Sequence, residues 1–211
     1  MTHCVTTVAV AAESVILLGQ KVKVVSQSLA NSRAAELAGE LMYTFIAAPC
    51  PEYRCGIVWG DKGLYAVFLV PQHEVTSSLP PFICHRWPHL RPSAELNQTH
   101  TTTPVTVELP AQAHGTLVLS GTEFQRQVWR ALLDIPVGET RTYADIAQSI
   151  GRAQAWRAVA NAVAANPLLY LVPCHRVVPR KGGVGKYRGG TELKRYFLAL
   201  EGLSFTEEEI L

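Results

Sequence analysis

The chain has 211 residues, 48% of them hydrophobic and 17% charged, and a formal net charge of +2 at neutral pH. These values are ordinary for a soluble globular protein, with room for one large domain or two small ones. No apolar run approaches the length of a membrane span, and the first twenty residues lack the basic start of a signal or transit peptide. We therefore expect a cytoplasmic protein without a membrane partner.

The five cysteines form an odd set without a C-x-x-C spacing. This pattern argues against a disulfide framework and fits a reducing compartment, in which a thiol is available for chemistry. Several cysteine and histidine side chains before residue 90 offer possible zinc ligands, but their spacings match no standard finger, so we predict no metal site. They are Cys4, Cys50, Cys55, Cys84, His85 and His89.

The first half of the chain predicts strands more clearly than helices. Residues 1–36 carry no motif, although alanine and leucine favour a helix over 28–41. The β-rich runs 53–60 and 64–70 flank Asp61-Lys62-Gly63 and predict a hairpin, and 39–46 predict a third strand. A proline- and serine-rich stretch then predicts loop with one short helix, and it leads to a domain boundary near residue 115.

The second half predicts helices with clear start and stop signals. Thr122 precedes Gln125, and Thr142 precedes Asp145, at the spacing of a capping box, and Gly151 is placed to end the second helix. The segment 153–166 follows at once, and the pair outlines a helix-turn-helix. The small side chains of segment 153–166 fit either a helix packed into the core or a slim helix that enters a groove. The helix pattern alone favours the core.

Basic residues concentrate late in the chain. Nine fall between residues 151 and 195, where Glu192 is the only acid, so this segment carries a net charge of +8. A local excess of this size is expected for a phosphate-rich partner, whereas the plainer interpretation is a solvated face.

Cys174 and His175 are adjacent, between an apolar run and a glycine-rich basic loop. A thiolate is a strong nucleophile, and the neighbouring imidazole can take the thiol proton directly or through water if the chain turns at Pro173. Glu201 is a candidate to orient that imidazole. The plainer alternative is an inert core cysteine, and the same Cys-His-Arg tripeptide at Cys84 shows that three residues alone are weak evidence.

Three linked segments resemble the O6-alkylguanine-DNA alkyltransferases, also called methylated-DNA–protein-cysteine methyltransferases. They are "GTEFQRQVWRALLDIPVGETRTYADIA", "RAVANAVAANPLLYLVPCHRVV" and "GGVGKYRGG" followed by "KRYFLALEG", and the match runs from about residue 116 to 203. The hairpin and "RWPHLRPSAEL" look more weakly like the smaller N-terminal domain of bacterial members.

The resemblance implies an α/β (α+β) fold in three parts. An unassigned extension over 1–36 precedes an N-terminal ribonuclease-H-like α/β domain over 37–115. The third part, 116–211, is a DNA-binding alkyltransferase domain with a winged-helix-like helix-turn-helix and short parallel strands.

The resemblance also implies a reaction and its residues. The partner is double-stranded DNA that carries O6-alkylguanine or O4-alkylthymine, bound through the minor groove by a monomer with no cofactor. The damaged base is flipped out, and its alkyl group moves irreversibly to the nucleophile Cys174 in a single turnover. The roles are shared among a catalytic group (Cys174, His175, Glu201, Asn166, Tyr143), a DNA-binding group (Arg157, Ala155, Ala158, Thr142, Gln154, Trp156) and a pocket group (Val177, Tyr187, Arg188, Gly185, Val184).

Two alternatives use the same residues. A DNA-binding sensor of alkylation would share the helix-turn-helix, but relatives of that kind replace the motif's cysteine. A cysteine hydrolase would share the thiol, would turn over repeatedly, and would not need a basic helix-turn-helix.

Overall fold

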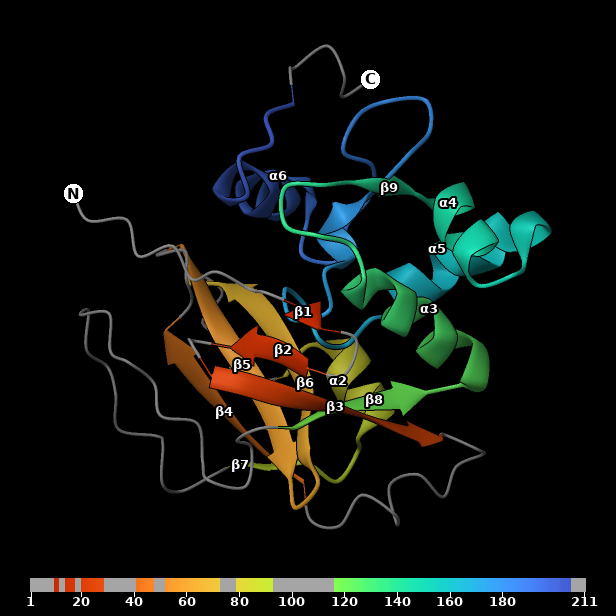
Figure 1. Ribbon diagram of the computed structural model, residues 1–211. Helices are drawn as coiled ribbons and strands as arrows, with labels where there is room; N and C mark the ends of the chain where they lie inside the picture. The colour runs from red at the N-terminus through yellow and green to blue at the C-terminus, as the bar shows by residue number, and fades with distance from the viewer. Residues whose placement is uncertain are drawn as a thin grey trace.

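The computed structural model describes residues 10–11, 14–17, 20–28, 41–47, 52–72, 79–92 and 116–205. A mixed sheet and a group of helices build the fold, and Figure 1 shows the sheet below and the helices α3 to α6 above it. The fold class is therefore mixed α/β, as predicted. Most of the helix predicted over 28–41 lies outside the described residues. None of the helices in the described ranges is long and apolar enough to cross a membrane.

The sheet has eight strands in the order β1-β2-β3-β8-β6-β5-β4-β7. The predicted hairpin is confirmed as the antiparallel pair β5 and β6, and the predicted third strand is β4, antiparallel to β5. The strands are β1 Val10–Ala11, β2 Ser14–Leu17, β3 Gln20–Ser28, β4 Met42–Ala47, β5 Tyr53–Gly60, β6 Gly63–Pro71, β7 Arg91–Pro92 and β8 Thr116–Gly121. The short helix predicted in the following loop is α2, Pro81–Arg86.

Both faces of the central strands are buried, because successive side chains of a strand point to opposite faces. On β5, Ile57 joins a core shared with α3, whereas Val58 joins a second core beneath α2. Leu117 and Val118 on β8 divide in the same way. The sheet is therefore a middle layer between α2 and the helices of the second half.

The division into domains stays a prediction. The strand β8 begins directly after the predicted boundary at residue 115, and it pairs in parallel with β3 and β6. The strands β1 to β3 fall within the segment 1–36 that the sequence leaves unassigned.

The second half follows its predicted start and stop signals. It contains α3 Glu123–Leu133, β9 Arg141–Thr142, α4 Tyr143–Ser149, η2 Ala153–Ala155, α5 Trp156–Ala164, η3 Cys174–Arg176, β10 Val177–Val178 and α6 Thr191–Leu200. Both capping boxes form, at Thr122 with Gln125 and at Thr142 with Asp145. Gly151 adopts φ 70°, which favours glycine and ends α4. β9 and β10 form the predicted short parallel pair.

The alanine-rich segment differs from its prediction in one detail and resolves the choice between core and groove. Its first turn, η2, is a 3₁₀ turn, and only then does α5 begin. Val159, Ala162 and Val163 are buried against the rest of the fold, while Arg157 and Ala158 are exposed. The helix therefore packs one face into the core and presents small side chains around one long cation on the other.

Candidate active site

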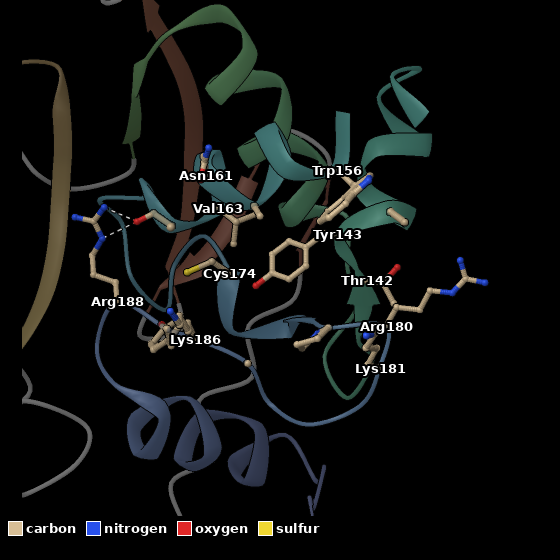
Figure 2. A pocket seen from close by; sticks show the side chains of 16 residues that line it. Thr142, Tyr143, Trp156, Asn161, Val163, Cys174, Arg180, Lys181, Lys186 and Arg188 are labelled. Atoms are coloured by element: carbon tan, nitrogen blue, oxygen red, sulfur yellow. Dashed lines mark hydrogen bonds between the residues drawn. The ribbon is translucent and has the colours of Figure 1, made fainter. Parts of the chain in front are cut away.

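A cavity of about 960 Å³ lies between α4, α5 and the loop over residues 179–188. Cys174 lines it and is only 3% exposed. In Figure 2, Tyr143 points its hydroxyl toward Cys174, and the cationic side chains Arg180 and Lys181 lie at the cavity's rim. The cavity thus joins a buried thiol to a basic surface.

The segment that carries the thiol is tied to the sheet by backbone hydrogen bonds. The Val67 amide of β6 donates to the Pro167 carbonyl, and the Leu169 amide donates to the Val67 carbonyl, both at 2.9 Å. Tyr170 then turns the chain with φ 69°, a conformation that costs a non-glycine residue of order 1–3 kcal/mol. The chain turns at η3 directly after Pro173, as predicted, so the side chains of Cys174 and His175 need not lie on opposite faces of a strand.

Asn166 is completely buried and braces this turn. Its Nδ2 donates to the Val172 carbonyl at 3.0 Å and to Cys174 Sγ at 3.1 Å, and its Oδ1 accepts from the Leu168 amide at 3.0 Å. One amide side chain thereby fixes the loop and also places a donor on the thiol sulfur, where it stabilises developing negative charge.

His175 is oriented by a carboxylate that is itself clamped. Its Nε2 lies 2.9 Å from Glu201 Oε1. Arg176 donates to the same carboxylate from Nε at 2.9 Å and from Nη2 at 2.7 Å, and its Nη1 donates to the Ile135 carbonyl at 2.6 Å. The imidazole also stacks on Tyr170, with ring centroids 5.9 Å apart.

These contacts define the proton positions on the imidazole. Burial raises the pKa of Glu201, but the hydrogen bonds from His175 and Arg176 outweigh burial and hold it at about 2. An ionised carboxylate only accepts hydrogen bonds, so Nε2 carries the proton and Nδ1 presents its lone pair. Nδ1 is buried and has no hydrogen-bond partner. Burial also lowers the pKa of His175, so the ring is neutral at pH 7 and able to accept a proton.

The thiol is protonated in the free protein. Burial raises the pKa of Cys174, and the donors Asn166 and Tyr187 and the cations Lys194 and Arg188 offset this only in part. The Tyr187 hydroxyl is close enough to lower the thiol pKa, although its geometry does not meet that of a hydrogen bond. A nucleophilic role for this sulfur would therefore require a nearby base to take the thiol proton first.

The glycine-rich loop is held in place from both sides. Arg188 Nε donates to the Ala164 carbonyl at the end of α5 at 2.8 Å, and its guanidinium lies 4.3 Å from the Phe82 ring of α2. Gly185 adopts φ 68°, and a Cβ there would lie 2.7 Å from the Pro179 ring. Glycine at 185 is therefore a steric requirement.

The predicted pocket group is only partly assembled on the cavity. Tyr187, Arg188 and Gly185 line it, whereas Val177 and Val184 are buried and do not. The Val177 carbonyl accepts a hydrogen bond from Lys194 Nζ at 2.6 Å.

The predicted DNA-binding group clusters at the start of α5. Trp156 and Thr142 line the cavity, and Arg157 and Ala158 are exposed beside it. Gln154 and Ala155 lie in η2, just before the helix, with Gln154 exposed and Ala155 half-buried. Four of the six predicted residues are thus exposed around the start of α5, namely Gln154, Trp156, Arg157 and Ala158.

Not every basic residue of the segment 151–195 reaches that surface. Arg176 and Lys194 are each 1% exposed and are used inside the fold. Burial lowers the pKa of Lys194 to about 8. These two cations therefore add nothing to an exposed basic face.

The second Cys-His-Arg tripeptide has none of this chemistry. Cys84 and His85 are exposed on α2, and Cys84 Sγ donates to the Leu79 carbonyl at 3.4 Å. Arg86 donates to the Ser120 carbonyl and joins α2 to β8. Cys4 and Cys50 lie outside the described residues.

Arg176, Lys194 and Tyr170 contact the site but were not among the site residues predicted from the sequence. Nothing in the local pattern marks a surface-type residue such as Arg176 or Lys194 as buried. One signal in the sequence was that Arg176 directly follows His175. A buried cation needs a carboxylate partner, and Glu201, the predicted partner of His175, could serve both residues.

Comparisons with known proteins agree with one another. Residues 123–203 match the family model described as 6-O-methylguanine DNA methyltransferase, DNA binding domain. A probable methylated-DNA–protein-cysteine methyltransferase of Acanthamoeba polyphaga mimivirus is 56% identical over 85 residues, which make up 40% of this chain and 56% of that relative. The inducible methylated-DNA–protein-cysteine methyltransferase of Bacillus subtilis is 47% identical over 91 residues, 43% of this chain and 51% of that protein.

The fold is similar to solved structures over a longer stretch. The crystal structure of Mycobacterium tuberculosis O6-methylguanine methyltransferase is 33% identical with a TM-score of 0.54, over 76% of this chain and 92% of that chain. The same organism's OGT in complex with DNA is 32% identical with a TM-score of 0.53, over the same shares. By contrast, the chain spans about half the length of the curated relatives it matches.

Proposed function

Because this chain belongs to the family of methylated-DNA–protein-cysteine methyltransferases, we propose that it repairs alkylated DNA by moving the alkyl group onto Cys174. The observation that carries the proposal is a buried thiol, at the bottom of a cavity with a basic rim, next to a neutral, oriented imidazole. The substrate is O6-alkylguanine, with O4-alkylthymine as a second substrate.

The first step generates the nucleophile. The Sγ proton passes through a water molecule to His175 Nδ1, and Glu201 stabilises the imidazolium that forms. Asn166 Nδ2, 3.1 Å from Sγ, stabilises the thiolate. This order of events fits the protonated thiol and the neutral imidazole of the free protein. The thiolate then forms only when the thiol, the water molecule and the imidazole are together in the cavity.

The second step transfers the alkyl group. The thiolate attacks the alkyl carbon, an S–C bond forms, and the C–O6 bond breaks with its electron pair left on the guanine. Tyr143 gives a proton to the leaving guanine and regains one from the imidazolium through solvent, so the thiol proton is conserved overall. Burial raises the pKa of Tyr143, which keeps its hydroxyl protonated at neutral pH. The thioether has no route back to a thiol, so each chain acts once.

The DNA must present the lesion outside the base stack. O6 in a stacked duplex is out of reach of a buried thiol, so the damaged nucleotide is flipped into the cavity. The exposed small side chains of α5 fit the minor groove, and Arg157 fills the space that the base leaves. The binding is driven by phosphate contacts, weakens with salt, and requires one protein chain.

The test is a titration of the purified protein with a duplex that carries one O6-methylguanine with a radiolabelled methyl group. We expect label to stop at about one methyl per chain, on the peptide that contains Cys174. Cys174→Ala should abolish transfer and leave DNA binding intact, with Cys84→Ala as the matched control that transfers normally. Label on Cys174→Ala would refute the nucleophile, binding without transfer would indicate a sensor, and repeated release of methyl would indicate a hydrolase.

A further inference from the structure

Trp156 is the only exposed tryptophan of the four in the chain. It is 47% exposed, whereas the others are 4% exposed or less (Trp59, Trp87, Trp129). A single exposed hydrophobic residue needs no explanation in general. Trp156, however, also lines the cavity that contains Cys174, so this exposed ring is part of the candidate site.

The indole occupies a defined place at the edge of that cavity. Trp156 is the first residue of α5, and Tyr143 is the first residue of α4, so two helix starts bring two aromatic rings to one cavity (Figure 2). Tyr143 is half-buried and points toward the thiol, whereas Trp156 remains open to solvent. An aromatic surface therefore runs from the thiol outward to the cavity mouth.

The surroundings of the indole are cationic. The Arg157 guanidinium lies 4.8 Å from the centroid of the Trp156 ring. Arg180, Lys181 and Lys186 line the same cavity. A flat apolar ring with several cations around it matches a nucleotide, whose base stacks on aromatic faces while its phosphates attract the cations.

We propose that Trp156 is a stacking platform for the extruded nucleotide at the mouth of the cavity, distinct from Arg157, which fills the space left in the duplex. This inference rests on the proposed function and adds a residue that contacts the lesion strand itself. The proposal gives Trp156 and Arg157 different roles. Arg157 matters only where a partner strand leaves a gap to fill, whereas Trp156 matters whether the lesion lies in duplex or in single-stranded DNA.

The kinetic test compares methyl transfer from single-stranded and duplex oligonucleotides with one O6-methylguanine. One base–aromatic stack is worth ~1–3 kcal/mol, so Trp156→Ala should slow transfer about tenfold or more on both substrates. Trp156→Phe keeps a ring and should recover most of the rate. Arg157→Ala should slow transfer on the duplex and leave the single strand near the wild-type rate.

The matched control is Leu200→Ala, because Leu200 is 51% exposed at the end of α6 and does not line the cavity. It should react at the wild-type rate on both substrates. A Trp156→Ala variant that matches wild type on the single strand would overturn the proposal. So would a loss limited to the duplex, because that pattern would place Trp156 in the same role as Arg157.

A spectroscopic test separates this inference from the transfer chemistry. In a Cys174→Ala background, the lesion strand should quench tryptophan emission and protect the indole from acrylamide. The additional change Trp156→Phe should remove the quenching. Quenching that persists without Trp156, or an indole that stays fully open to acrylamide in the complex, would refute the stacking role. Quenching by Trp156 without any transfer by the wild-type protein would instead refute the proposed repair function and leave the platform standing.

Discussion

Glu201→Gln tests the charge clamp, by which we mean the Glu201 carboxylate held between His175 and Arg176. The carboxylate of Glu201 is 7% exposed and holds both His175 Nε2 and the buried Arg176 guanidinium. The substitution preserves shape and removes the negative charge. The neighbouring Arg176 is then a buried cation without a counter-ion, which is a costly state.

The size of the effect follows from the pKa of Glu201. Its shift from 4.5 to about 2 corresponds to about 3 kcal/mol at neutral pH, at about 1.4 kcal/mol per pKa unit. Water that reaches part of the carboxylate screens it, so we expect Glu201→Gln to lower the free energy of unfolding by about 2–3 kcal/mol. Because the pKa is depressed in the folded state, this contribution is complete above pH 4.5 and fades as the pH falls through about 2.

The assay is urea denaturation of wild type and variant between pH 7 and pH 2.5. At pH 3 the carboxyl group is protonated in the unfolded chain but still ionised in the folded protein, where its pKa is about 2. Only about one pKa unit of the stabilisation then remains, so the difference in unfolding free energy should shrink to about 1 kcal/mol. The matched control is Glu192→Gln, whose carboxylate pairs with Arg195 at an exposed position and should change stability by less than about 0.5 kcal/mol. A difference that stays constant across this range would refute the charge clamp, since a packing defect does not titrate.

Three further predictions address the rest of the site. Because burial lowers the pKa of His175 and raises that of Cys174, the rate constant for methyl transfer should be flat from below pH 6.5 to above pH 9. Because the pKa of Lys194 falls to about 8, the unfolding free energy of wild type relative to Lys194→Met should rise between pH 8 and pH 10.5, by up to about 3 kcal/mol in denaturant titrations. Arg188→Ala removes both anchors of the glycine-rich loop and should slow transfer from the free alkylated base about tenfold, or about 1.4 kcal/mol, in single-turnover assays.

Each of these has an outcome that contradicts it. A transfer rate that climbs steadily from pH 6 to pH 9 would mean that solvent, and not the imidazole, ionises the thiol. Parallel pH profiles for wild type and Lys194→Met would mean that the amine does not titrate inside the fold. For the loop, Lys181→Ala is the control at an exposed position, and an equal loss in both variants would mean that charge alone is responsible.

The sequence predicted the structural features that depend only on residues close together in the chain, namely helix caps, a helix stop and a hairpin. The capping boxes at Thr122 and Thr142 and the stop at Gly151 formed as predicted, because a cap needs only a side chain and the amide three residues on. The hairpin of β5 and β6 was predictable for the same reason, since a tight turn and β-branched runs specify it locally. Cys174 was predicted as the nucleophile because a proline, a histidine and a basic glycine-rich loop accompany it in the sequence.

Long-range packing gives the two identical Cys-His-Arg tripeptides different surroundings. The tripeptide at Cys84 lies on an exposed helix, whereas the one at Cys174 is buried and has its histidine joined to Glu201, which lies 26 residues later. The same packing placed Arg176 and Lys194 inside the fold and left Trp156 open at the cavity mouth. Burial of a side chain depends on which distant segments of the chain pack against it, and the pattern of neighbouring residues in the sequence does not specify that packing. The sequence by itself therefore proposed Cys174 as the reacting residue and His175 as its base, and only the tertiary structure showed how their protons are held.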